Sequence, residues 1–315
     1  MNDNRERFII MADATCDLSE EMQEQYGVVV VPSHITLPDG RSIPSFLKWE
    51  EFDRNEFYTN LKNNPTGYST APPNVEEFGA AFEEYAKLGK DIMLLTISSG
   101  MSGTYNFALQ AQKNISEKYP NVNIRVIDTL RFGPAHGLIT VYSSMLRDEG
   151  KSFDEVVNYI ETNRNRFHQA GWLDDLSFVA KQGRITHAKA FFGTLAGVKP
   201  IGEFDYNGMT TVIGKAKGAK SAYQALVSYI GATIEHPEEQ LIFIAHTNRY
   251  PQAEVYKKMI EDTFHPKAVV INDVFPMCGI NVGPGLMAAY YFGKPISKDL
   301  SEERALMDKF INGGK

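Results

Sequence analysis

Residues 98–106, Ser-Ser-Gly-Met-Ser-Gly-Thr-Tyr-Asn, have the composition of a turn that could bind an oxyanion. They follow an apolar segment at 91–97 that we expect to be a strand, and they open a segment that we expect to be a helix. Backbone N–H groups and the positive end of a helix favour a carboxylate or a phosphate, and hydroxyls donate further hydrogen bonds without adding charge. The same residues would also serve simply to cap a helix, so both roles are open at this point.

Known catalytic motifs do not account for this turn. The nucleophile elbow Gly-x-Ser-x-Gly has one residue between its serine and its second glycine, whereas here a glycine follows the serine directly. Residues 214–221 have glycines and lysines at spacings that differ from those of a phosphate loop. The histidines are scattered, so we expect no metal site and no cofactor. A dyad of Ser98 or Ser99 with His246 stays open, because no spacing selects or excludes it.

The composition is that of a globular protein. The chain has 315 residues, 43% of them hydrophobic, which is enough for one large or two ordinary domains. The net charge of -7 argues against a nucleic-acid partner, since that requires a concentrated basic surface. Residues 1–12 lack the length of a signal sequence or a membrane span, so we expect a cytoplasmic protein with no integral membrane association. Cys16 and Cys278 are too few for a disulfide framework and are expected to be buried thiols.

Strands alternate with helices in the first half of the sequence. Asn74 is expected to cap one of these helices, because Glu77 three residues later completes a capping box. Alternating elements indicate a mostly parallel sheet that binds its ligand beyond the carboxyl ends of the strands, where the turn at 98–106 would lie. Strands are expected at 8–12, 28–31, 91–97 and 123–128, and helices at 19–26, 50–62, 75–85, 102–118 and 135–149.

The second half contains a hairpin pattern around Asp-Tyr-Asn-Gly at 205–208. The predicted fold is therefore α/β, with an N-terminal domain at 1–168 whose mostly parallel sheet is covered by helices, and a C-terminal α+β domain at 169–315 that contains antiparallel strands. We expect helices at 152–169, 219–235 and 251–263, strands at 172–179, 198–204, 209–213, 240–245 and 268–272, and a glycine-rich close at 279–285.

Short motifs along nearly the whole chain occur in the order known from one protein family. They are Asp-Ala-Thr-Cys-Asp-Leu at 13–18, Ser-Thr-Ala-Pro-Pro-Asn at 69–74, the segment 97–106, Val-Ile-Asp-Thr at 126–129, Lys-Gln-Gly-Arg-Ile at 181–185, Val-Lys-Pro-Ile at 198–201 and Val-Gly-Pro-Gly at 282–285. This set resembles the DegV family of bacterial fatty-acid-binding proteins. The hydroxyl-rich segment and the run from Gly-Arg-Ile to Lys-Pro-Ile are specific in combination, although each alone would be weak.

The resemblance implies a long-chain fatty acid as the ligand, held in an apolar tunnel between or within two domains. In that family a threonine and a serine bind the carboxylate. Carried over by position, Thr70 is the threonine, and Ser98 and Ser99 occupy the serine position, with Ser99 as the expected direct donor. Asn281 and Gly283 complete the expected ligand-binding set. Because such a protein only carries the acid, we expect no catalytic residue.

The resemblance also implies a partner, since many members present the acid to a separate kinase subunit that phosphorylates it. We expect Arg184 and Lys217 to face that partner. The chain departs from the family at two of these positions: Asn281 replaces a histidine, and Lys217 replaces an arginine. A lysine is a point charge that lacks the bidentate fork of arginine, so the kinase partnership follows less directly than lipid binding does.

The tunnel lining is weakly defined by the sequence. Aromatic side chains at helical spacing are more often ordinary core than ligand contacts, and residues 183–193 could form either a lid or a simple connector. The candidates for the lining are Phe78, Phe82, Phe107, Phe191, Phe192 and Leu195.

A second function stays open. The protein could be an enzyme that acts on a small phosphorylated or acyl substrate, because dihydroxyacetone kinase domains have a related α/β fold. A bound fatty acid in the purified protein would favour the carrier. Turnover of an acyl or phosphate ester that disappears on replacing Ser99 by alanine would favour the enzyme.

Overall fold

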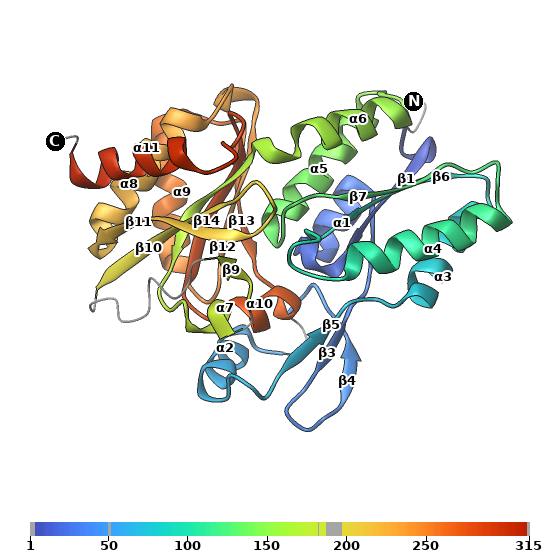
Figure 1. The fold of residues 1–315 in the computed structure, drawn as a ribbon, viewed down its shortest axis with the longest axis horizontal. Coiled ribbons are helices and arrows are strands. Elements are labelled where there is room, and N and C mark those ends of the chain that lie inside the picture. Colours follow the sequence, from blue (N-terminus) through green and yellow to red (C-terminus); the bar gives the residue numbers. More distant parts are fainter. Residues whose placement is uncertain (1–3, 50–51, 182, 187–196, 314–315) are drawn as a thin grey trace. The chain divides into compact units, whose positions relative to one another are not determined.

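A computed structural model describes residues 4–49, 52–181, 183–186 and 197–313 (Figure 1). The chain forms two compact units, and it passes between them more than once. The predicted domain boundary between residues 168 and 169 stays a prediction. Unit 1 consists of Met1–Trp49, Gly67–Arg164 and Phe275–Cys278, and unit 2 of Glu50–Thr66, Asn165–Val274 and Gly279–Lys315.

Unit 1 contains a four-stranded sheet in the order β2-β1-β6-β7. All its pairings are parallel, which confirms the predicted sheet. The strands consist largely of buried apolar residues, as expected of strands covered on both faces. Their bounds are β1 Phe8–Asp13, β2 Val28–Val31, β6 Asp91–Thr96 and β7 Ile124–Asp128.

Helices cover both faces of this sheet (Figure 1). On one face, Phe78 and Phe82 of α3 and Ala108 of α4 pack in one cluster with sheet residues such as Met11 and Leu94. Helices α5 and α6 contact the strands from the other face. The capping box at the start of α3 is present as predicted. The helices are α1 Glu20–Tyr26, α3 Val75–Ala86, α4 Thr104–Lys118, α5 Pro134–Asp148 and α6 Phe153–Asn163.

Unit 1 also contains a small antiparallel sheet that the sequence analysis missed, in the order β4-β3-β5. Each of its strands has only three residues, and most of these are exposed or half-buried. Such short strands show no hydrophobic alternation from which they could be recognised. They are β3 His34–Thr36, β4 Ser42–Pro44 and β5 Ser69–Ala71.

Unit 2 contains a seven-stranded mixed sheet in the order β13-β12-β14-β8-β10-β11-β9. Antiparallel pairs join β14 to β12 and β8, and β10 to β8 and β11, which confirms the predicted antiparallel strands. The strands are β8 Phe167–Leu173, β9 Ile185–Thr186, β10 Val198–Phe204, β11 Thr210–Lys217, β12 Leu241–His246, β13 Ala268–Asp273 and β14 Leu286–Phe292. The remaining helices are α2 Arg54–Asn63, α7 Ser177–Lys181, α8 Gly218–Thr233, α9 Tyr250–Phe264, α10 Pro276–Val282 and α11 Ser301–Asn312.

Two expected elements around β8 are wrong. The helix expected over 152–169 ends at Asn163, and the strand expected over 172–179 instead begins at Phe167, with α7 taking the later residues. β8 is central in the sheet and pairs along its length with β14, more than one hundred residues away in the sequence. At Gly171 a Cβ atom would lie 2.3 Å from the Ala288 Cβ atom. This close packing against a distant strand, which local periodicity cannot reveal, determines the conformation here.

The C-terminal segment is more regular than expected. Part of the glycine-rich close at 279–285 is helical, because α10 extends to Val282. β14 and α11 were not predicted from the sequence. β14 reads Leu-Met-Ala-Ala-Tyr-Tyr-Phe, an apolar run that should have been recognised as a buried strand.

Candidate functional site

Ser98 orders the turn between β6 and α4. The residue is fully buried. Its N–H donates to the Arg131 carbonyl oxygen at 2.8 Å, and its own carbonyl oxygen accepts from the Met101 N–H at 2.9 Å. Its Oγ accepts from the Gly100 N–H at 3.2 Å. Ser98 is therefore part of the support of the turn, and its expected contact with a ligand stays a prediction.

Ser99 is the exposed serine of this turn. Its N–H donates to Oδ1 of Asp128 at 3.1 Å, and the same oxygen accepts from the Leu130 N–H at 3.0 Å. Asp128 is buried, and its carbonyl oxygen accepts from Nη1 of Arg164 at 2.6 Å. The Ser99 hydroxyl forms no hydrogen bond with any residue in the described part of the chain. The backbone of Ser99 is thus fixed while its hydroxyl is available to a ligand.

The structure changes which groups of the turn can bind an anion. From the sequence, this role was expected partly of backbone N–H groups. The N–H groups of Ser99, Gly100 and Met101 are already bound to Asp128 and to Ser98. The side-chain hydroxyl of Ser99 is therefore the better donor for a carboxylate.

A buried network of hydrogen bonds at the ends of β1 and β6 stabilises the start of the turn. Oδ2 of Asp13 accepts from the Ile97 N–H at 2.7 Å, and Oδ1 accepts from the Thr15 hydroxyl at 2.5 Å. The Thr15 oxygen lies 3.3 Å from Nδ1 of His136, whose Nε2 donates to the Leu95 carbonyl oxygen at 3.2 Å. Burial lowers the pKa of His136, which fits a neutral ring with its proton on Nε2.

No role was assigned to these supporting residues from the sequence. The available signal was positional: Asp13 and Asp128 are the last residues of two expected parallel strands, at the edge where ligands bind in such sheets. Both also lie in the motifs that carry the family resemblance.

Thr70 lies in β5, opposite Ile35 of β3 in the antiparallel pair. It is half-buried, whereas its neighbours Ser69 and Ala71 are exposed. Successive side chains of a strand point to opposite faces, so Thr70 projects from the face opposite to its two neighbours. Thr70 and Ser99 both belong to unit 1. That they bind one carboxylate together stays a prediction.

Asn281 and Gly283 lie at the end of α10 and just after it. Asn281 is half-buried. Gly283 has a φ of +76°, and a Cβ atom at this position would lie 2.4 Å from Cγ of Phe178. The backbone conformation and the close packing both require glycine here. The backbone and the packing thus explain the glycine at position 283 without a ligand. The expected ligand contacts of Asn281 and Gly283 stay predictions.

The two residues expected to face a partner lie in unit 2. Arg184 is half-buried, and its N–H donates to the Val179 carbonyl oxygen at 3.1 Å after the end of α7. Lys217 is exposed at the junction of β11 and α8. Exposure permits contact between Lys217 and a partner, and the predicted role of both residues stays a prediction.

The candidates for the tunnel lining fall into three groups. Phe78 and Phe82 are fully buried core residues of α3, with ring centroids 6.3 Å apart. Phe107 is 37% exposed on α4. The other three candidates, Phe191, Phe192 and Leu195, lie outside the described residues, as does most of the segment considered as a lid.

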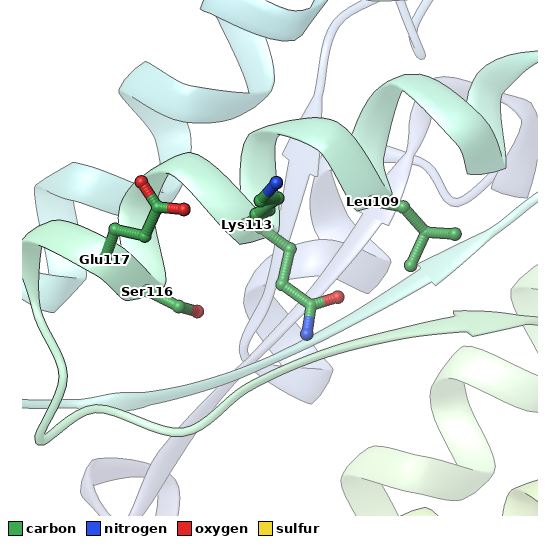
Figure 2. Close-up of a pocket in the computed structure, with 5 residues that line it drawn as sticks. Leu109, Lys113, Ser116 and Glu117 are labelled. Carbon is green, nitrogen blue, oxygen red and sulfur yellow. The ribbon is translucent and has the colours of Figure 1, made fainter.

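A shallow depression of about 480 Å³ runs along α4 (Figure 2). Figure 2 shows that its five lining side chains come from α4 alone. None of the predicted ligand-binding residues lines it, so this depression is not the predicted tunnel. The lining residues are Leu109, Gln112, Lys113, Ser116 and Glu117.

His246, the candidate partner of a nucleophilic serine, is engaged within unit 2. The residue is 1% exposed, and its Nδ1 accepts from the Arg249 N–H at 3.3 Å. Burial lowers the pKa of His246, which favours the neutral ring. Because Nδ1 accepts a hydrogen bond, the proton of the neutral ring is on Nε2, which lies 3.6 Å from Oδ1 of Asp273. Neither ring nitrogen is then a free acceptor for a serine proton, which removes support from the dyad.

The described residues contain neither a metal site nor a membrane-spanning helix. In the described part of the chain, no three His, Cys, Asp or Glu side chains gather as metal ligands would. Among the same residues, no helix combines the length and the hydropathy needed to cross a bilayer. Cys16 and Cys278 are free and buried, as expected, and burial raises the pKa of both thiols.

Comparison with known families supports the resemblance noted in the sequence. The family model described as "Uncharacterised protein, DegV family" matches residues 7–294. The chain belongs to the DegV family. A DegV domain-containing protein of Clostridium perfringens is 31% identical over 287 residues, which cover 91% of this chain and 98% of that protein.

Solved structures of DegV proteins share the fold. A DegV family protein from Eubacterium eligens, loaded with heptadecanoic acid, is 25% identical and superposes with a TM-score of 0.77 over 91% of this chain and 100% of that one. The Fatty Acid Kinase (Fak) B3 protein of Streptococcus pneumoniae, loaded with linoleic acid, is 23% identical with a TM-score of 0.77, over 91% of this chain and 99% of that one. Both similarities extend through units 1 and 2, which supports the predicted α/β fold class with its mixed second sheet.

Proposed function

We propose that this DegV protein binds a long-chain fatty acid and presents it to a fatty acid kinase subunit for phosphorylation. The carboxylate is bound by the hydroxyls of Thr70 and Ser99, with Ser98, Asn281 and Gly283 close to the head group, and the acyl chain lies in an apolar tunnel. The protein acts as a cytoplasmic carrier rather than as a catalyst, and its cargo serves phospholipid synthesis. The observation on which the proposal chiefly depends is the fatty acid bound to the similar Eubacterium eligens protein.

The chemistry of the β6–α4 turn supports this ligand. A carboxylate needs a few fixed donors, and a protein that only carries it needs no general base. Ser99 offers an exposed hydroxyl on a backbone that Asp128 fixes. Burial of an acyl chain contributes about 0.8 kcal/mol per methylene before ordering costs. The tail therefore supplies most of the affinity, and the hydroxyls orient the head group.

The similarity to the Fatty Acid Kinase (Fak) B3 protein of Streptococcus pneumoniae supports a kinase partner. The exposure of Lys217 agrees with a contact surface there, and Arg184 follows α7 in the same unit. We propose that both residues face the kinase subunit. Incubation of the loaded protein with such a subunit and ATP should yield acyl phosphate, and Lys217→Ala should slow this transfer without changing lipid affinity.

The head-group assignment is tested with delipidated protein titrated with palmitic acid by calorimetry. Thr70→Ala and Ser99→Ala should each weaken binding by about 1–3 kcal/mol, because a carboxylate loses one charged hydrogen bond. Ser69→Ala is the matched control for Thr70, since Ser69 is the exposed neighbour on the opposite side of β5. Ser116→Ala on α4 is the control for Ser99.

Three outcomes are distinguishable. Affinity that falls only in the Thr70 and Ser99 variants supports the assignment, whereas unchanged affinity in both contradicts it. Absence of any bound fatty acid, together with ester hydrolysis that needs Ser99, would instead identify an enzyme.

A further inference from the structure

A second polar cluster lies in unit 2, at the carboxyl ends of the parallel strands β12 and β13. His246 and Asp273 are the last residues of these strands and face each other in register. Ligands of sheets with parallel strands bind at this edge. We call the residues joined by contacts there the β12 edge cluster, which consists of Arg54, Asp174, Lys199, His246, Arg249 and Asp273.

Two buried donors of this cluster have no acceptor. Nη1 of Arg54 donates to Oδ1 of Asp273 at 2.6 Å, but no described residue accepts from the buried Nε of Arg54. Nε2 of His246 is also buried and without a hydrogen bond, 3.6 Å from the same Asp273 oxygen. A buried donor without an acceptor destabilises the folded protein, because it has lost its hydrogen bonds to water. Both atoms are donors, so the missing group is an acceptor.

The charges of the cluster favour an anion. Asp174 binds two cations, with Nζ of Lys199 at 2.5 Å from its Oδ1 and the Arg249 guanidinium on its Oδ2. Arg54 pairs with Asp273. Three cations thus face two carboxylates, which leaves one positive charge in excess. Glu254, which bonds to the Tyr250 hydroxyl, is a further acid beside the cluster, and it is exposed to solvent that screens its charge.

The start of α9 adds to this field. Arg249 immediately precedes the first helical residue, Tyr250, in a helix of 15 residues. The N-terminal end of such a helix has a partial positive charge. The ring of Tyr250 lies edge-on to His246, with centroids 5.7 Å apart. The two donors without an acceptor therefore lie in a region of positive potential.

From this arrangement we infer that the β12 edge cluster binds the phosphate group of a small soluble molecule. One phosphate has three terminal oxygens, so it can accept from both Arg54 and His246, and its negative charge offsets the excess cation. A carboxylate could accept from the same two donors, but it has one oxygen fewer and at most one charge, so the cations of the cluster attract it less strongly. Because the side chain of His246 is 1% exposed, the ligand we infer is a small molecule that can diffuse into the cluster, rather than a headgroup anchored in a bilayer. This site does not depend on the proposed fatty-acid binding.

The test uses the full-length protein labelled with ¹⁵N-histidine and titrated with inorganic phosphate. The imidazole signal of His246, assigned by its loss in His246→Gln, should shift and saturate. Acetate should bind at least about ten-fold more weakly than phosphate, because it offers fewer acceptors and less charge. Calorimetry on the unlabelled protein gives the same affinities independently of the label.

Arg54→Lys is the decisive variant, because it keeps a cation opposite Asp273 but removes the Nε donor. It should weaken phosphate binding by about ten-fold or more. Arg41→Lys makes the same change at an exposed arginine of unit 1, which pairs with Asp39, and should leave phosphate binding unchanged. Circular dichroism checks that both variants are folded.

Three results would overturn the inference. Absence of a saturable shift would mean that the donors bind only an ordered water. Equal affinity for phosphate and acetate would contradict the ligand class. Wild-type phosphate affinity in Arg54→Lys would show that phosphate binds elsewhere. If Arg54→Lys does not fold, the His246 variants decide. Wild-type phosphate affinity in both His246→Gln and His246→Ala would then show that phosphate binds elsewhere.

Discussion

Asp128 connects the end of β7 to the turn that presents Ser99. Its Oδ1 atom accepts from the N–H groups of Ser99 and Leu130, so its removal would leave both without their acceptor. We expect Asp128→Ala to lower palmitic acid affinity by about ten-fold, because the Ser99 hydroxyl would no longer be held in one position. Asp128→Asn keeps an oxygen acceptor and should retain most of the affinity. Calorimetry of the delipidated proteins measures both effects.

A double-mutant cycle separates this positioning role from a general loss of stability. If Asp128 acts through Ser99, then Asp128→Ala should have no further effect on affinity in a protein that already carries Ser99→Ala. Equal losses in both backgrounds would show that Asp128 acts on the ligand by another route. Wild-type affinity in Asp128→Ala alone would refute the positioning role.

The sequence identified the turn of the candidate site but not the use of its individual atoms. Serines and glycines after an apolar strand indicated a polar turn at the sheet edge. They could not show that Ser98 would be buried while Ser99 is exposed, because that difference depends on the Asp128 carboxylate at the end of the next strand and on the Arg131 carbonyl in the loop after it. Hydrogen bonds between neighbouring strands are long-range contacts, and local patterns do not contain them.

The capping box at the start of α6 makes the stability of the protein depend on pH. In α6, the Ser152 side chain accepts from the Glu155 N–H, while the Ser152 N–H donates to Oε2 of Glu155 at 2.7 Å. This backbone hydrogen bond and that from the Ser152 hydroxyl lower the pKa of Glu155. A lowered carboxyl pKa contributes stability at pH values above the ordinary carboxyl pKa, and this contribution is lost as the pH falls through the folded-state value.

We therefore expect the melting temperature of the wild type to fall more steeply between pH 6 and about pH 3 than that of Glu155→Gln. The variant cannot titrate at this position, so it lacks that part of the pH dependence. Glu84→Gln, an exposed position within α3, is the control and should keep the wild-type slope. Parallel curves for the wild type and Glu155→Gln would show that the capping box is not formed in solution.

The elements that sequence could predict are those whose signals are local. The cap at Asn74 and the hairpin around residues 205–208 were correct, because both depend on side chains within a few residues of one another. β8 was misplaced because its seven buried residues are selected by packing against β14 and β10, including the close approach at Gly171. Three-residue strands such as β5, which contains Thr70, are too short to have a period.

Each of the two units contains a segment that is distant in the sequence from most of its residues. α2 belongs to unit 2, where Tyr58 is 1% exposed and its hydroxyl donates to the Val274 carbonyl oxygen at 2.6 Å. Phe275 belongs to unit 1, where its N–H donates to Asp17 at 2.9 Å and its ring stacks on Trp49. Composition and linker patterns do not reveal such an exchange of segments, because neither segment differs from its neighbours in character.

This exchange determines how fragments of the chain should behave. A fragment of residues 1–168 would contain α2 without its partners in unit 2, so Phe57, Tyr58 and Leu61, all buried in the protein, would be exposed. We expect this fragment to self-associate. The same fragment with residues 50–66 replaced by a Gly-Ser linker lacks those side chains and should contain more monomer. Light scattering and analytical ultracentrifugation compare the two, and equal monomer content in both would mean that α2 does not need unit 2 to bury its apolar face.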